Sequence, residues 1–360
     1  MYTVYTKYPI RDTVYHMQPA ILIPLCAFVF AVLLHLLALR AFPRLGLLDF
    51  PERYGLKRPR LPYPTGIISA MAFIVLFLLL EPPDRETLGI VAAIVMLTFV
   101  SFIDDRRPLP SSLRLSVQLC TALLIFLTGT RIFTITNPFG GIIPLDTWVI
   151  PSVVLKNPSL SGALFTMLWL GLTMNALNWF DGIRGQVSVV SLLGFLTIGA
   201  LSLSPRVGDM QLSLLAFTLA GLAAAGLLFD FPPAKVVMGD TGSMFFGLML
   251  GVLTIYSGGK VATGFLVLGV PLIDSVIVVL RRMLKGTSPF RGNATDEHLH
   301  HRLLRIGWSE RQIIALTAVL GGSFGVAALF MSTVDKFLAA LALLGIMLLL
   351  SVYSGRKFRA

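Results

Sequence analysis

Eleven apolar runs, each close to the length of a membrane-spanning helix, divide this 360-residue chain. A spanning helix needs about 20 mostly apolar residues, and fewer where its ends carry long polar side chains. The runs lie at 21–39, 64–80, 88–103, 114–129, 161–177, 186–203, 210–229, 241–257, 262–280, 311–331 and 335–352. Only 13% of the residues are charged and the mean hydropathy is +0.83, which excludes a soluble enzyme. The pattern predicts an all-α polytopic membrane protein with about 11 transmembrane helices, or ten if two closely spaced runs form one.

The lysines and arginines predict which side of the membrane each loop faces. Of the 29 basic residues, 19 follow odd-numbered runs or lie in the C-terminal tail, whereas eight lie on the other side. Because basic loops favour the cytoplasm, we expect the N-terminus outside and the C-terminus inside. The formal charge of +11 then reflects membrane sidedness and contact with membrane lipids, and it predicts no nucleic-acid partner.

The chain is expected to form one membrane domain. Residues 1–20 form an outer N-terminal segment, 21–352 a single transmembrane catalytic domain, and 353–360 a basic cytoplasmic tail. The outer loop 130–160 contains Asn137-Pro138-Phe139-Gly140-Gly141, a turn sequence between alternating polar and apolar residues, which predicts a small β-hairpin. The loop 283–310 contains three of the five histidines and is expected in the cytoplasm.

Two adjacent carboxylates, Asp104 and Asp105, stand where the third run reaches the inner side. Mutual repulsion and desolvation at the edge of a low-dielectric region would raise the pKa of at least one of them unless a cation is near. The simpler interpretation is a solvated loop in which Arg106 and Arg107 pair with them.

A second polar segment places Asn175, Asn178 and Asp181 at intervals of three residues. On a helix end these side chains share one face and offer oxygen ligands to a hard cation. The alternative is a helix terminus where the same side chains satisfy free backbone groups and Gly182 and Gly185 permit the turn.

A third segment, Phe231 to Ser243, runs directly into the eighth apolar run. The small residues from Gly239 to Ser243 at a helix N-terminus would leave backbone amides free to bind phosphate, and Asp240 is placed to hold Mg²⁺ against it. The alternative is a helix cap with Asp240 or Thr241 at the N-cap position. That alternative leaves the preceding Pro-Ala-Lys run unexplained.

The histidine-containing loop forms a fourth segment. A helix over 295–307, capped at its first residue, would place His298, His301, Arg302 and Arg305 on one face, where they can present charge to a phosphorylated substrate. The alternatives are a surface helix that binds anionic lipids and a zinc site, for which no matching ligand spacing exists.

Two isolated features are less specific. The basic residues Lys57 and Arg58 precede Pro64-Thr65-Gly66; they bind phosphate or only enforce topology, and topology explains them adequately. Asp274 is an intramembrane carboxylate two helical turns before Arg281. Such a residue is functional by default, with simple pairing as the alternative.

Together these segments resemble the polyprenyl-phosphate N-acetylhexosamine-1-phosphate transferases, the WecA-like branch of glycosyltransferase family 4, to which the phospho-N-acetylmuramoyl-pentapeptide transferases are related. The likeness covers residues 20–350. Its motifs are Phe102-Ile103-Asp104-Asp105, Asn175 to Gly185, Pro233-Ala234-Lys235 with Gly239-Asp240-Thr241-Gly242-Ser243, and Lys285 to Phe290 followed by His298-Leu299-His300-His301-Arg302-Leu303. Four motifs in the right order, all on one predicted side, argue against chance agreement.

The resemblance implies transfer of a sugar 1-phosphate from a UDP-N-acetylhexosamine to undecaprenyl phosphate or another polyprenyl phosphate, with UMP released, as the first step of a cell-surface glycan. It implies a bacterial-type inner membrane, a cytoplasmic active site, and Mg²⁺ or Mn²⁺ as cofactor. It assigns the metal to Asn178 and Asp240, and catalysis to Asp104, Asp105, Asp181, His300 and His301. It assigns substrate binding to Lys57, Arg114, Asn175, Arg184, Gly239, Ser243, His298 and Arg302.

The chain departs from the family pattern at three positions. Arg184 stands where the family usually has a second Asp, Gln186 where it has Leu, and Asp296 where a basic residue is expected. Because the first two lie near the expected nucleotide site, the sequence does not identify the donor sugar. It also leaves open whether the protein forms a homodimer. One rival is a muramoyl-pentapeptide transferase, which the His-Leu-His-His sequence disfavours. The other is a transporter or flippase of an anionic or lipid-linked substrate, which predicts broken helices in matching halves and an internal repeat; the sequence contains neither.

Overall fold

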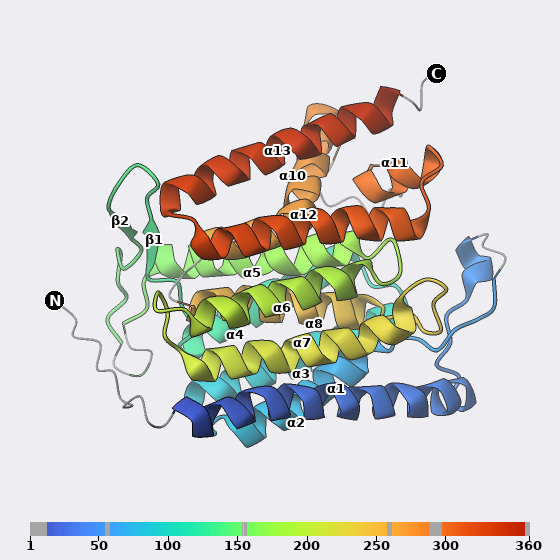
Figure 1. Ribbon diagram of the computed structural model, residues 1–360, viewed down its shortest axis with the longest axis horizontal. Coiled ribbons are helices and arrows are strands. Elements are labelled where there is room, and N and C mark those ends of the chain that lie inside the picture. Colours follow the sequence, from blue (N-terminus) through green and yellow to red (C-terminus); the bar gives the residue numbers. More distant parts are fainter. Residues whose placement is uncertain are drawn as a thin grey trace.

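The computed structural model describes residues 13–54, 58–152, 154, 157–257, 261–287 and 297–356, with the backbone alone for 13–20, 53–54 and 356. Its helices are α1 (Thr13–Arg44), η2 (Pro51–Tyr54), α2 (Gly66–Leu80), α3 (Arg85–Arg106), α4 (Ser111–Thr128), α5 (Leu160–Phe180), α6 (Gln186–Leu203), α7 (Met210–Asp230), α8 (Asp240–Tyr256), α9 (Val261–Val267), α10 (Gly269–Leu284), α11 (Leu299–Arg305), α12 (Glu310–Phe330) and α13 (Thr333–Arg356). The strands are β1 (Thr134–Thr136) and β2 (Ile142–Pro144). The long helices lie side by side in one bundle, with the hairpin at one end and α11 at the other (Figure 1).

Eight helices among the described residues are long and apolar enough to cross a membrane, namely α1, α3, α4, α5, α6, α7, α12 and α13. Helices α2 and α8 are apolar but shorter, and α9 with α10 passes the same test only as a bent pair. An α-helical polytopic membrane protein is therefore confirmed. The count of eleven spans and the orientation stay predictions.

The run at 262–280, expected as one span, consists of two helices that meet at 85°. Helix α9 ends at Val267 and α10 begins at Gly269. Pro271 has no N–H to donate to the Val267 carbonyl, and its ring crowds the preceding turn, so a continuous helix is disfavoured here. Helix α10 consequently departs from the common direction of its neighbours (Figure 1).

Helix α8 lies at the centre of the bundle. Every residue from Thr241 to Ile255 is buried, among α2, α3, α5, α6 and α7. Small residues allow the close approach: a Cβ at Gly247 would lie 2.7 Å from the carbonyl oxygen of Thr173 on α5. Such packing of small residues is a usual means of helix association in an apolar solvent. It fixes the first residue of α8, Asp240, beside the ends of α3 and α5.

The predicted hairpin is confirmed. Strand β1 pairs antiparallel with β2, with Ile135 opposite Ile143, and the Asn137 side chain accepts a hydrogen bond from the Phe139 amide within the turn. At the start of the chain, α1 already includes residues 13–20, so the segment expected before the first span is partly helical.

Candidate active site

A guanidinium joins two aspartates at the end of the bundle opposite the hairpin. Nη1 of Arg114, in the first turn of α4, lies 3.2 Å from Oδ2 of Asp104 and 3.6 Å from Oδ2 of Asp240. The other oxygen of Asp104 accepts a hydrogen bond of 2.6 Å from the Leu109 amide. The side chain of Asp104 is 8% exposed and that of Asp240 is 31% exposed. Asp240 is therefore the carboxylate open to a ligand.

Asp105, next to Asp104, has a different position. Its Oδ1 accepts from the Tyr63 hydroxyl at 2.7 Å and from the Asp240 amide at 2.8 Å, and its Oδ2 accepts from the amide and the hydroxyl of Thr241. Gly239, the N-cap residue of α8, provides no side-chain cap. Asp105 thus supplies the cap of α8 from another helix, and a carboxylate is favourable at this positive end.

This cap changes the expectation for the Gly239–Ser243 turn. The amides of Asp240 and Thr241 donate to Asp105, so they are not the free phosphate-binding amides that the sequence predicted. A helix cap, the alternative to free amides, is present, although its acceptor is Asp105 and not Asp240 or Thr241. The assignment of Gly239 and Ser243 to substrate binding stays a prediction.

The loop before α2 packs directly on this turn. The amides of Thr65 and Gly66 donate to the carbonyls of Val237 and Met238, and a Cβ at Gly66 would lie 2.2 Å from Gly242 Cα. Gly239 has φ +80°, and its missing side chain leaves room for Tyr63 and Asp105. The Pro64-Thr65-Gly66 segment therefore forms part of the framework of the site. The interpretation in which the basic residues before it only enforce membrane topology did not predict this contact. Tyr63 was missed because a lone tyrosine in a loop carries no motif.

The end of α5 brings the asparagines of the second segment to the same place. Nδ2 of Asn178 donates to the Ser243 hydroxyl at 3.2 Å, whereas Nδ2 of Asn175 donates to Gln118 of α4 and to the Gly171 carbonyl. Asp181 follows α5 as its C-cap residue. Burial raises the pKa of Asp181 well above its usual value, and the negative charges of Asp240, Asp230 and Asp105 add to this. Asp181 is thus part of the acidic centre, defined here as Asp104, Asp105, Asp181 and Asp240.

Two histidines of α11 lie against the turn that follows Asp181. A Cβ at Gly182 would meet Nε2 of His300 at 2.0 Å and Nε2 of His301 at 2.9 Å. His300 is 1% exposed, and among the described residues neither of its ring nitrogens has a hydrogen-bond partner. Burial, with the charges of His301 and His298, lowers the pKa of His300 well below its usual value. His300 is therefore neutral near pH 7 and can donate a hydrogen bond but supplies no fixed positive charge.

Helix α11 is shorter than the helix expected over 295–307, and its packing differs from the predicted face. It begins at Leu299 with His298 as N-cap, and the predicted cap at position 295 lies outside the described residues. His298 is buried and pairs with Asp274, with 2.8 Å between Nδ1 and Oδ2. Arg302 donates to the hydroxyl and the carbonyl of Ser351 on α13. The predicted face is thus divided, because these two side chains point to different neighbours; their part in substrate binding stays a prediction.

Two substituted positions and one basic residue complete the predicted set. Arg184 lies in the tight turn between α5 and α6, and its buried Nε has no partner within the part of the chain that the structure describes. Burial and the neighbouring charge of Arg58 lower the pKa of Arg184. Gln186 is buried and donates to Thr317 of α12, so its side chain is directed at another helix. Lys57 lies outside the described residues.

The side chains of this site can hold Mg²⁺ only as a partial set of ligands. Among the described residues, no three His, Cys, Asp or Glu side chains are arranged to hold a metal ion. Mg²⁺ usually binds one or two carboxylates and completes its shell with water and substrate phosphates. Asp240 is open to a ligand, and the Asn178 side chain is hydrogen-bonded to it, so this pair suits that partial coordination. The acidic centre fits a cation that arrives with a phosphorylated substrate.

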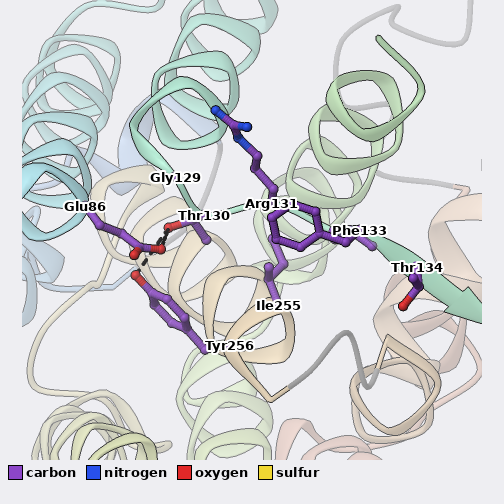
Figure 2. A pocket seen from close by; sticks show the side chains of 9 residues that line it. Glu86, Gly129, Thr130, Arg131, Phe133, Thr134, Ile255 and Tyr256 are labelled. Carbon is purple, nitrogen blue, oxygen red and sulfur yellow. Dashed lines mark hydrogen bonds between the residues drawn. The ribbon is translucent and has the colours of Figure 1, made fainter. Parts of the chain in front are cut away.

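A second polar cluster lies at the hairpin end. Glu86, Thr130 and Tyr256 point toward one another beside a cavity of about 320 Å³ (Figure 2). The Thr130 hydroxyl donates to Oε1 of Glu86 at 2.9 Å and lies 3.2 Å from the Tyr256 hydroxyl. Arg131 at the same cavity stacks over Phe126 at 4.8 Å. No motif in the sequence points to these residues.

Comparison with known proteins places this arrangement in context. Residues 87–258 match the model of the family described as Glycosyl transferase family 4. A Bacillus subtilis protein named "Probable undecaprenyl-phosphate N-acetylglucosaminyl 1-phosphate transferase" is 26% identical over 82% of this chain and 80% of its own. "Decaprenyl-phosphate N-acetylglucosaminephosphotransferase" of Mycolicibacterium smegmatis is 30% identical over 67% and 62%. "Undecaprenyl-phosphate alpha-N-acetylglucosaminyl 1-phosphate transferase" of Escherichia coli K12 is 26% identical over 84% and 82%. These matches confirm the resemblance drawn from the motifs, and the family segment contains the whole acidic centre.

Proposed function

We propose that this protein, whose residues 87–258 belong to glycosyl transferase family 4, transfers N-acetylglucosamine 1-phosphate from its UDP-sugar to a polyprenyl phosphate. A phosphate oxygen of the acceptor forms a bond to the β-phosphorus of the donor, and the bond from that phosphorus to the bridging oxygen breaks. The electron pair leaves with UMP, and the lipid product is polyprenyl-diphospho-N-acetylglucosamine. The sugar and the acceptor are those named for the three relatives.

The observation that supports this function most is the guanidinium of Arg114 between two carboxylates, at a narrow cleft of about 10 Å³ that both apolar and charged side chains line. A polyprenyl phosphate needs both, because its chain is apolar and its head is an anion. Arg114 stands between two carboxylates and offers five donors in a planar fork, which suits a phosphate. The cleft is lined by Leu97, Val100, Ser101, Asp104, Arg114, Val117, Gln118, Asp240 and Met244.

In this proposal the residues of the acidic centre hold and orient two anions. Mg²⁺ or Mn²⁺ would be held by Asp240 and Asn178, and when bound it supplies charge neutralisation at the donor diphosphate. Asp104, anchored by the Leu109 amide and Arg114, would orient the acceptor phosphate or accept its proton. Asp105 keeps the first turn of α8 in place, so that Asp240 faces the cleft. Asp181, with its raised pKa, would donate a hydrogen bond to the UDP-sugar.

We also propose eleven spans, with the acidic centre at the cytoplasmic face of a bacterial-type inner membrane. The bias of lysines and arginines supports this orientation, and α1 begins at the end of the bundle opposite to the one where α13 ends (Figure 1). Single cysteines at the exposed positions Pro83 and Lys235, in a background with Cys26 and Cys120 replaced by serine, test it in sealed cells. An impermeant reagent should label position 83 from outside and position 235 only after lysis. Labelling of position 235 in intact cells would contradict the proposed orientation.

The activity is tested with the purified full-length chain in detergent. Labelled UDP-N-acetylglucosamine, undecaprenyl phosphate and Mg²⁺ should yield a labelled lipid and UMP in equal amounts. UDP-N-acetylgalactosamine and UDP-N-acetylmuramoyl-pentapeptide are the comparison donors. Transfer from the muramoyl-pentapeptide donor alone, or no labelled lipid from any of the three, would reject the proposal.

A further inference from the structure

Asp274 is a buried carboxylate that lies outside the acidic centre. It stands in the second turn of α10 and is 4% exposed. A carboxylate removed from water is strongly disfavoured unless it is paired and hydrogen-bonded. Both of its oxygens are used: Oδ2 lies 2.8 Å from Nδ1 of His298, and Oδ1 accepts a hydrogen bond of 2.9 Å from the Leu299 amide.

These two contacts fix the start of α11. The N-cap residue His298 makes no side-chain hydrogen bond to the first turn of α11, and a helix this short has little stability of its own. Asp274 satisfies the Leu299 amide from α10. The place where α11 begins is therefore set by α10 and not by a local capping sequence.

The His298 ring contacts the His300 ring, which contacts the His301 ring, so the orientation of the first constrains the other two. The rings of His298 and His300 are stacked, with centroids 5.7 Å apart and an interplanar angle of 15°, and those of His300 and His301 are 4.2 Å apart. On the other side, the His300 ring meets the Phe180 ring edge to face at 5.6 Å. Gly182 leaves no spare room, because a Cβ there would lie 2.0 Å from Nε2 of His300. A rotation of His298 must therefore move the histidines that lie against the site.

We infer that Asp274 is a positioning residue, which orients His298 and the first turn of α11 and thereby holds His300 and His301 against the Asp181-Gly182 turn. With the Asp274 oxygen as acceptor, Nδ1 of His298 donates this hydrogen bond, which selects the Nδ1–H tautomer of the neutral ring. The activity readout of this inference rests on the proposed function. The spectroscopic readout does not.

Ser351 provides a matched control. Its hydroxyl accepts from Arg302 at 3.0 Å and also from Arg281, so it ties α11 to α13 without touching the histidine rings. Ser351→Ala weakens the docking of α11 but leaves the bond between Asp274 and His298 intact. A loss that Asp274→Asn shows and Ser351→Ala does not show is due to orientation and not to docking.

The experiment uses the full-length chain in detergent with ¹⁵N-labelled histidine. In Asp274→Asn, the side-chain carbonyl can still accept from Leu299 while its NH₂ donates to His298, so the ¹⁵N shifts of His298 should change from the Nδ1–H to the Nε2–H tautomer. The signals of His300 and His301 should move, and those of His35, which bonds Ala31 on α1, should not. The kcat should fall about tenfold to a hundredfold, as for other residues that orient a working histidine, with the acceptor KM within about twofold.

Three results would overturn the inference: an unchanged His298 tautomer in Asp274→Asn, equal shifts of His300 and His301 in Ser351→Ala, or a loss of kcat that adds in full to that of His298→Ala. A purely structural role would lower the midpoint of thermal unfolding and the yield of both variants without a separate fall in kcat. If the wild-type chain transfers no sugar phosphate, the proposed function fails, and the histidine spectra still decide whether Asp274 positions α11.

Discussion

Helices α3 and α8 carry polar side chains at both of their ends, and the two ends balance their charges differently. At the hairpin end, Glu86 accepts from Thr130. Because Thr130 has a single proton to give, its oxygen accepts in turn from Tyr256. At the other end, the guanidinium of Arg114 faces two carboxylates, and burial keeps a third, Asp181, at a raised pKa.

The difference separates a stabilising network from a site. At the hairpin end each polar group contacts another, so the cluster holds helix ends together and needs no ligand. The acidic centre gathers four carboxyl groups beside the single guanidinium of Arg114, and ionising all four together costs stability unless a cation and a substrate complete the site. Titratable groups held in such an unfavourable state mark functional sites.

Removal of one charge from the open carboxylate should have the largest effect. Asp240→Asn is expected to lower kcat at least about a hundredfold, because charge neutralisation between two phosphates contributes several kcal/mol and about 1.4 kcal/mol corresponds to tenfold. Transfer to undecaprenyl phosphate and the midpoint of thermal unfolding are measured together, with Glu86→Gln as the control at the other end. Full activity of Asp240→Asn, or of the wild type in EDTA, would show that the two ends do not differ in this way.

The adjacent aspartates should separate into a chemical and a structural residue. Asp104→Asn is expected to lower kcat about a hundredfold at an unchanged midpoint of thermal unfolding, if Asp104 acts as an acid–base group. Asp105→Asn is expected to cost about 1–3 kcal/mol of stability, since the cap of α8 loses acceptors. Thermal unfolding and steady-state kinetics of both variants, with Tyr63→Phe as a milder cap variant, provide the test. Two variants with equal midpoints and equal kcat would contradict the separation.

Steric displacement of the histidines should have an intermediate effect. Gly182→Ala places a methyl group 2.0 Å from Nε2 of His300, and a shift of about 1 Å in catalytic geometry can cost up to a hundredfold in rate. Gly171→Ala is the matched control, because a Cβ there meets none of the described residues outside its own helical turn within 4 Å. We expect a fall in kcat of about tenfold or more for Gly182→Ala alone. Equal kinetics of the two variants would exclude His300 and His301 from the reaction.

The smallest effect is expected at the hairpin end. Tyr256→Phe removes one hydrogen bond and should lower the free energy of unfolding by about 0.5–1.5 kcal/mol without a change in kcat. Denaturant or thermal unfolding in detergent measures the first quantity, and the transfer assay the second. A fall in kcat at an unchanged stability would show that this cluster, too, belongs to a functional site.

The sequence predicted where the chemistry lies, because charged and amide side chains are costly within apolar runs and are kept only where they act or pair. It therefore singled out Asp104, Asp240 and the Asn175 to Asp181 segment as candidates, and its apolar runs predicted a helical membrane protein. It could not assign different roles to Asp104 and Asp105. The bonds of Asp105 reach Asp240 and Thr241, and the first of these joins residues 135 positions apart, so no local pattern reports them.

The tertiary structure also decided the arrangement of α11. Periodicity from position 295 predicted a face of His298, His301 and two arginines, but α11 begins at Leu299 because Asp274 of α10 accepts its first amide. The same reason applies to Tyr63 and Gly66, whose function depends on the turn at Gly239. The sequence determines which residues are too polar to lie in lipid without a partner or a function. Contacts between distant segments determine which of these residues are open to substrate and which hold the site together.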